Sequence, residues 1–169
     1  MDKKRIQNVV IKEIQTELDL QNSVEVIRNA FVTVARDFHL TETNAPTNPA
    51  FITLPKLQEL RSKGTIFFGL FEKGGQVGFV AIEKGPSSDY YLEKLAVIPT
   101  VRHRGFGTQL LDFVVQYVKK QGGKKISIGT INEHKILKGW YIRNGYKETG
   151  TKTFPHLPFT VCFMEKSIV

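Results

Sequence analysis

The chain has 169 residues, of which 41% are hydrophobic and 24% charged, a composition that is ordinary for one soluble globular domain. No apolar run approaches the roughly 20 residues of a membrane-spanning helix, and no hydrophobic signal core follows the basic N-terminal residues. A single cysteine, Cys162, excludes an internal disulfide framework. We therefore expect one domain, residues 1–169, in the cytoplasm.

Lysine and arginine exceed aspartate and glutamate by 24 to 16, so the net charge is +8. This charge leaves open an anionic ligand, a nucleic-acid surface or a plain solvated surface. Basic residues form only short clusters, at 3–5, 119–120 and 124–125, and aromatic residues do not alternate with them. We expect no nucleic-acid partner and no membrane partner.

The residue pattern in the first part of the chain predicts a strand followed by two helices. Apolar residues recur through 6–14, which indicates an opening strand. Apolar residues at helical spacing predict a helix over 23–38, with Ser23 as its N-cap. The polar stretch 41–48 is a loop too long for a simple connector. A shorter helix with Thr53 as its N-cap ends at Gly64.

The middle of the chain predicts a hairpin, a central strand and an amphipathic helix. Two apolar runs, 65–72 and 76–83, flank Lys73-Gly74-Gly75, which is typical of a β-hairpin. After a short turn, 90–98 is the expected central strand. Apolar residues at helical spacing predict a helix over about 105–121, which two glycines end.

The last third predicts a parallel strand, a helix and two more strands. The strand 125–130 should run parallel to the central strand, because crossover connections are right-handed. A helix over 133–144 should end at Gly145, and strands at 146–154 and 160–167 should close the chain. Cys162 lies in this last strand, which favours a buried thiol over a nucleophile.

The stretch 92–111 joins the central strand to a helix through a basic turn with two glycines. Such a helix start offers unpaired N–H groups and partial positive charge to a phosphate. Gly105 and Gly107 would let the backbone approach an anion, and Arg102 and Arg104 add charges suited to phosphate oxygens. The pattern alone also fits a plain structural turn. Common dinucleotide and P-loop motifs fit poorly, since the third glycine and the Gly-Lys-Ser/Thr are missing.

Two motifs resemble those of the GCN5-related N-acetyltransferase (GNAT) superfamily. Arg102-x-x-Gly105-x-Gly107, after the run 95–99, resembles its acetyl-CoA-binding turn, and 140–146, Trp-Tyr-Ile-Arg-Asn-Gly-Tyr, resembles its second aromatic segment. The resemblance implies an α/β (α+β) fold, with a central mixed twisted sheet of six to seven strands and about four helices. It also implies acetyl-CoA as co-substrate. The residues then expected to bind it are Leu95, Ala96, Val97, Arg102, His103, Arg104, Gly105, Phe106, Gly107, Thr108 and Asn132. We expect no metal site, because His39 and His103 show no metal-ligand spacing with any cysteine or carboxylate.

The same resemblance implies catalytic roles for two residues. Tyr141 is the expected general acid that protonates the leaving thiolate, although it would also fit as a core residue beside Trp140. Strand alternation predicts that Tyr91, Glu93, Leu95 and Val97 share one face of the central strand. Glu93 is the candidate base, acting directly or through an ordered water, although it would also fit a plain ion pair.

The sequence departs from the family pattern at the asparagine that commonly contacts coenzyme A. That position is His134, while Asn132 lies two residues earlier, so either residue could turn toward the co-substrate. His134 fits better as a surface residue in the first helical turn than as a base. We expect the acceptor pocket to be built by 39–54 and 153–160, where His156 is a further candidate contact.

The expected function is direct transfer of an acetyl group from acetyl-CoA to a primary amine, on a small molecule or a peptide. One alternative is a non-catalytic module that binds coenzyme A or another phosphate ligand, and another is a basic nucleic-acid-binding domain. The sequence leaves a homodimer open and does not identify the amine.

Overall fold

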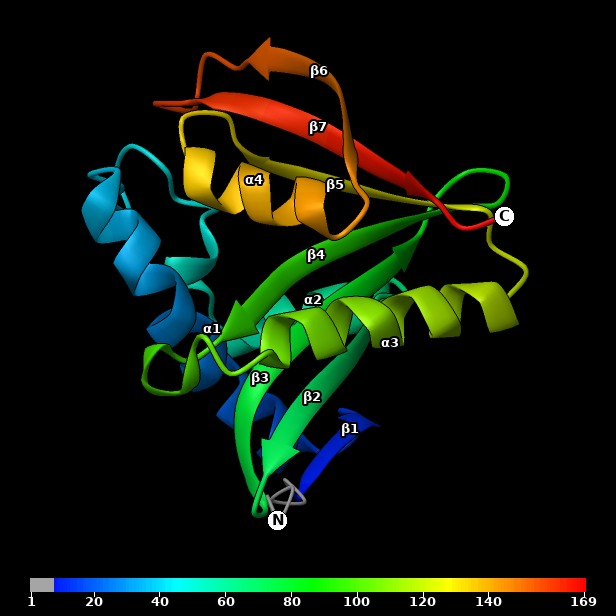
Figure 1. Ribbon diagram of the computed structural model, residues 1–169. Helices are drawn as coiled ribbons and strands as arrows, with labels where there is room; N and C mark the ends of the chain where they lie inside the picture. Colours follow the sequence, from blue (N-terminus) through cyan, green and yellow to red (C-terminus); the bar gives the residue numbers. More distant parts are fainter. Residues whose placement is uncertain (1–7) are drawn as a thin grey trace, which may run out of the picture.

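Within residues 8–169, the part of the chain that the computed structural model describes, seven strands form one sheet (Figure 1). Their spatial order is β1-β2-β3-β4-β5-β7-β6. Only β4 and β5 pair in parallel, as predicted, and the other neighbours are antiparallel. The strands are β1 (Val9–Glu13), β2 (Ile66–Glu72), β3 (Gly75–Lys84), β4 (Asp89–Val97), β5 (Lys125–Ile131), β6 (Lys147–Thr153) and β7 (Thr160–Ser167).

Four α-helices cover this sheet in the described part of the chain. They are α1 (Glu17–Asp37), α2 (Leu54–Ser62), α3 (Phe106–Lys120) and α4 (Lys135–Arg143), with short 3-10 helices η1 (Pro49–Phe51) and η2 (Pro99–Val101). The mixed sheet, the helix count and the order of elements confirm the predicted architecture. The predicted opening strand is confirmed over β1, and its first two residues, 6 and 7, lie outside the described residues. Among 8–169, no helix is both long and apolar enough to cross a membrane.

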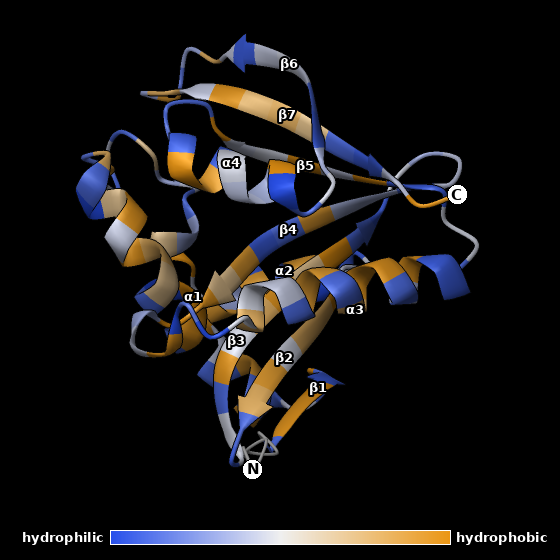
Figure 2. Cartoon of the chain, in the orientation of Figure 1, coloured by the Kyte–Doolittle hydropathy of each residue, from blue (hydrophilic) through white to orange (hydrophobic). Residues whose placement is uncertain are grey.

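The sheet separates two hydrophobic cores, one against α1 and α2 and the other against α3 and α4. Alternate residues of β3 supply both, because successive side chains of a strand point to opposite faces. Phe79 and Ala81 pack with Leu57 of α2, whereas Val80 and Ile82 pack with Leu110 of α3. Figure 2 shows β2 and β3 as largely hydrophobic ribbons between the helices. The buried residues of α3 recur at the helical spacing that the sequence predicted.

The N-terminus of α1 lies six residues before the predicted cap. The side chain of Thr16 accepts a hydrogen bond from the Asp19 N–H (3.1 Å), so Thr16 is the N-cap and the helix begins at Glu17. Ser23 instead lies fully buried inside the helix, where its hydroxyl donates to the Asp19 carbonyl (2.7 Å). The prediction of Ser23 as N-cap was therefore wrong, because the apolar periodicity already includes Leu20, one turn before Val24, and Leu20 is fully buried.

Other local predictions are confirmed. Thr53 caps α2 through the Lys56 N–H, with proline in the first turn. The hairpin between β2 and β3 turns at Lys73 and Gly74, both at positive φ. Cys162 in β7 is fully buried, as predicted, and burial raises the pKa of its thiol.

The cap at Thr16 gives the first prediction. Thr16→Ala should lower the free energy of unfolding by about 1 kcal/mol, because the Asp19 N–H loses its acceptor. Urea unfolding followed by circular dichroism measures the change. Thr43→Ala, in the exposed loop after α1, is the matched control and should leave stability unchanged. Equal stabilities of Thr16→Ala and the control would contradict Thr16 as the cap.

Candidate active site

The turn between β4 and α3 has a backbone shaped to bind an anion. His103 (φ 63°) and Gly105 (φ 84°) lie in the left-handed region, while Arg104 between them does not. Alternation of this kind turns successive N–H groups toward one concave side, which is a common anion-binding arrangement. A non-glycine residue such as His103 is costly at positive φ, and such strain is typical of functional turns.

The N-terminus of α3 adds further unpaired donors to this turn. Gly105 is the N-cap without a side chain, and the Gln109 N–H donates to the Gly105 carbonyl (3.0 Å). The amides of Phe106, Gly107 and Thr108 therefore have no acceptor within the helix. Together with the helix dipole, these amides fit a diphosphate.

Gly107 has a packing role that the sequence did not reveal. A Cβ atom at this position would lie 3.0 and 3.2 Å from two indole carbons of Trp140 in α4. The indole thus packs directly on the first turn of α3. We had expected the missing Cβ to make room for an anion, whereas in this structure it makes room for Trp140.

The Arg102 side chain contacts the end of β4 and the helix α1. Its guanidinium donates to the carbonyls of Val97 (3.1 Å) and Ala30 (2.7 Å) and to the hydroxyl of Thr33 (3.1 Å). Three of its five N–H donors are thus bound to protein oxygens, so the structure gives this side chain a structural contact, and its role toward phosphate stays a prediction. Thr33 and Ala30 carry no motif that would have indicated this contact.

Arg104 remains the basic side chain of the turn that reaches solvent. Its guanidinium is 37% exposed, lies 4.8 Å from the Phe106 ring centre and donates to Glu72 at the end of β2 (2.8 Å). The sequence did not indicate Glu72 as its partner, because the two residues lie 32 positions apart.

Strand β4 separates from β5 soon after it begins. Only Asp89, Tyr90 and Tyr91 pair with β5, so the edge of β4 from Leu92 onward has no partner in that strand (Figure 1). Unpaired strand edges offer N–H and C=O groups to an extended ligand. Leu95, Ala96 and Val97 lie on this part of β4, just before the turn.

A bulge in β4 changes which residues share a face. Phe79 pairs with Ala96 but Ala81 with Glu93, so β4 carries one extra residue at this step, and Lys94 has a φ of 53°. The predicted common face for Tyr91, Glu93, Leu95 and Val97 is therefore wrong. Because Ala81 faces α1 and α2, its partner Glu93 does too, whereas Leu95 and Val97 pack on the α3 side.

Glu93 is an accessible carboxylate with an altered proton affinity. Its side chain is 48% exposed. Partial burial nevertheless raises its pKa, the Lys94 ammonium at 3.8 Å opposes this, and Glu83 on the neighbouring strand adds to it. A carboxylate with a raised pKa is a better proton acceptor, which suits a general base.

Tyr141 lies on the other side of the sheet, in an aromatic cluster. It is 7% exposed, and its ring lies 5.0 Å from the Trp140 ring and 5.5 Å from the Tyr146 ring, both edge-on. Burial, with a smaller effect of Tyr146, raises the pKa of its phenol. The hydroxyl carries a proton at neutral pH, and its raised pKa makes it a weaker acid than a solvated phenol.

Asn132 and His134 are both engaged in local structure at the start of α4. The Asn132 carboxamide accepts from the Lys138 ammonium (2.8 Å). His134 is the N-cap of α4, accepts from the Leu137 N–H (3.3 Å) and packs on Phe38. It is half-buried and its pKa is lowered by burial, so it is less exposed than we predicted.

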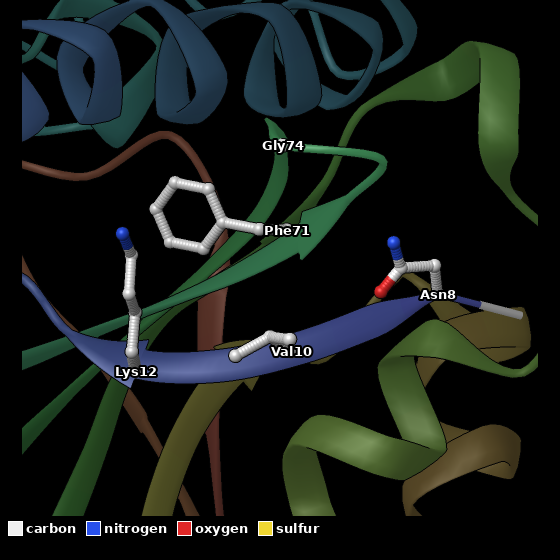
Figure 3. Close-up of a pocket in the computed structure, with 5 residues that line it drawn as sticks. All are labelled: Asn8, Val10, Lys12, Phe71 and Gly74. Carbon is white, nitrogen blue, oxygen red and sulfur yellow. The ribbon is translucent and has the colours of Figure 1, made fainter.

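Two hollows elsewhere contain none of the predicted residues. One of about 180 Å³ lies at the β1 edge and is lined by Asn8, Val10, Lys12, Phe71 and Gly74 (Figure 3). The other, of about 340 Å³, lies between α1 and the β2–β3 turn, and its walls include Asp19, Glu25 and Gln76. His156, the other candidate contact, is exposed beside Phe154.

Comparison with family models finds a match that covers more than half of the chain. The model of the acetyltransferase (GNAT) family matches residues 31–146. This range includes α3, the turn before it, Glu93 and Tyr141. No curated protein sequence matches the chain.

Solved structures share the fold at low sequence identity. The ribosomal-protein-S18-alanine N-acetyltransferase of Escherichia coli superposes with a TM-score of 0.75 at 15% identity, over 95% of this chain and 94% of that one. The PaiA N-acetyltransferase of Thermoplasma acidophilum, in complex with coenzyme A, gives 0.73 at 19% identity, over 95% and 99%. An aminoglycoside 6'-N-acetyltransferase complexed with coenzyme A gives 0.71 at 17% identity, over 95% and 97%.

The contact between Gly107 and Trp140 gives the second prediction. Gly107→Ala should cost about 1–3 kcal/mol of stability and change the emission of Trp140, the only tryptophan, because the new methyl group meets the indole. Fluorescence during urea unfolding measures both effects. Gly105→Ala is the control: its Cβ would meet open space, so stability should fall through backbone strain while native emission stays unchanged. Identical native emission in Gly107→Ala and wild type would contradict the contact.

Proposed function

Since this chain belongs to the acetyltransferase (GNAT) family, we propose that it transfers an acetyl group from acetyl-CoA directly to a primary amine. The observation that carries the proposal is the anion-binding turn before α3, placed beside the free edge of β4. Two of the structurally similar acetyltransferases were solved with coenzyme A, which supports acetyl-CoA as the co-substrate.

In this proposal the backbone does most of the binding. The amides of residues 103–108 bind the diphosphate, and the edge of β4 at Leu95, Ala96 and Val97 binds the pantetheine arm and the thioester. Arg104 supplies a charged donor from the side of the turn. Asn132 contributes at the start of α4 if it releases Lys138, which has a second partner in Glu148.

The chemistry divides between two side chains on opposite faces of the sheet. An alkyl amine has a pKa of about 10.4, so it must lose a proton before it attacks. Glu93 accepts this proton, directly or through a water, and the amine nitrogen then bonds to the thioester carbon. The C–S bond breaks, and Tyr141 donates its proton to the departing thiolate. The nitrogen then loses its extra proton, which restores the neutral phenol, so that one proton in total is released at Glu93 for each amide formed. No acyl-enzyme forms, and the products are an amide and free coenzyme A.

The acceptor is proposed as a primary amine on a small molecule or a peptide. Similar structures belong to enzymes named for a ribosomal-protein alanine and for an aminoglycoside, so one fold serves both classes. The segments 39–54 and 153–160 form the acceptor side of the site in this proposal. The direct test is incubation with acetyl-CoA and a panel of amines, monitored by thiol release. Binding of coenzyme A without turnover on any amine would favour a non-catalytic module.

The third prediction concerns the general acid. Tyr141→Phe should lower kcat by about 100-fold or more while leaving coenzyme A affinity nearly unchanged, because only the proton donor is lost. Tyr146→Phe is the matched control. Its buried hydroxyl has no hydrogen-bond partner among the described residues, so the rate should persist. An undiminished rate for Tyr141→Phe would remove the phenol from the mechanism.

The fourth prediction concerns pH. A base must be deprotonated to work, so kcat/KM should fall on acidification through the pKa of Glu93, which lies above the ordinary 4.5. Glu93→Gln should remove most of the rate, and the remaining kcat/KM should no longer fall at acidic pH (the acidic limb of the pH profile). Glu83→Gln removes a like charge, so it should keep the rate and move the limb to lower pH. A limb that is the same in wild type and Glu83→Gln would count against Glu93 as the base.

A further inference from the structure

Arg102 joins three parts of the chain that meet at the proposed co-substrate turn. Its Nε donates to the carbonyl of Val97, the last residue of β4. Its two terminal nitrogens donate to Thr33 Oγ1 and to the Ala30 carbonyl, which lie three residues apart on α1. The side chain thus connects the end of β4 and the start of the turn to α1, where Thr33 lies 69 positions earlier in the chain.

The geometry requires a guanidinium. Thr33 accepts from Arg102 and donates its own hydroxyl proton to the Ala30 carbonyl (3.0 Å), so both groups on α1 are fixed relative to one another. A planar fork with parallel donors matches this pair of acceptors, while a third donor on the same side chain reaches back to Val97. Lysine has the charge but cannot place donors at these three positions.

The electrostatics favour a structural role over charge pairing. The three acceptors bound by the guanidinium are neutral oxygens. The side chain is partly buried, and this desolvation lowers its pKa. Partial burial of a cation costs free energy, and three hydrogen bonds to neutral oxygens offset that cost here without an ion pair.

We propose that Arg102 is a positioning residue that holds the anion-binding turn in register with β4 and α1, and that it does not bind the diphosphate through its side chain. The expected effect on co-substrate affinity rests on the proposed function. The contacts that hold the turn are present without a ligand. If the turn shifts, the amides at the start of α3 no longer line up with the edge of β4.

The test removes the contact from each side separately, and the change on α1 leaves the residues of the turn untouched. Thr33→Val deletes the hydroxyl on α1, and Arg102→Lys deletes the fork while keeping the charge. In the protein without ligand, both should speed hydrogen–deuterium exchange in the segment 98–109 by about fivefold. The double variant should exchange no faster than the stronger single variant, because the two changes break one network.

Coenzyme A affinity is measured by titration of Trp140 emission in the same proteins. Thr33→Val should weaken binding by about three- to tenfold, although it lies outside the turn. Thr149→Val is the matched control, since the Thr149 hydroxyl on β6 also donates to a backbone carbonyl, that of Phe163 on β7. It should leave both measurements at the wild-type value.

If Thr33→Val shows the exchange rate or the coenzyme A affinity of the wild type, the inference is overturned. An Arg102 that binds phosphate directly predicts that Thr33→Val leaves the coenzyme A affinity unchanged. If the wild-type protein does not bind coenzyme A, the proposed function fails. Exchange alone then decides whether Arg102 holds the turn.

Discussion

Backbone N–H groups at the start of α3 have no acceptor inside the helix, and the site is arranged around that fact. Positive φ at His103 and Gly105 aims neighbouring amides at the same side. Arg102 fastens this turn to β4 and α1, and Trp140 packs on Gly107 from α4. An anion-binding surface made of backbone depends on its supports, because no single side chain can replace an amide that moves.

The bulge in β4 puts the two proposed catalytic side chains on opposite faces of the sheet, and the separation of β4 from β5 leaves a strand edge between them. The extra residue at Lys94 leaves Glu93 on the face of α1 and α2, while Leu95 and Val97 turn to the other face. Tyr141 lies on that other face, beside α3. A thioester held at the edge of β4 would therefore lie between a proton acceptor on one face and a proton donor on the other. In this account the sheet itself separates the acid from the base.

Most of the fold followed from local patterns, and the errors have physical causes. Alternating apolar residues predicted the strands, and Thr53 with its proline predicted α2. Ser23 failed as a cap because Leu20 continues the buried apolar pattern one turn before Val24, so the helix starts earlier than the predicted cap. Strict alternation failed at Lys94 because no single-sequence signal marks a bulge at a non-glycine residue. The Arg102 contact could not be predicted, since it joins residues 69 and 72 positions apart through ordinary side chains and a carbonyl.

The most direct test of the central claim is an NMR titration of the backbone amides with coenzyme A, repeated with pantetheine, which lacks the diphosphate. The account predicts large shifts at the amides of Phe106, Gly107 and Thr108 with coenzyme A, and small shifts there with pantetheine. Equal shifts with both ligands, or shifts confined to residues away from 103–108, would contradict it.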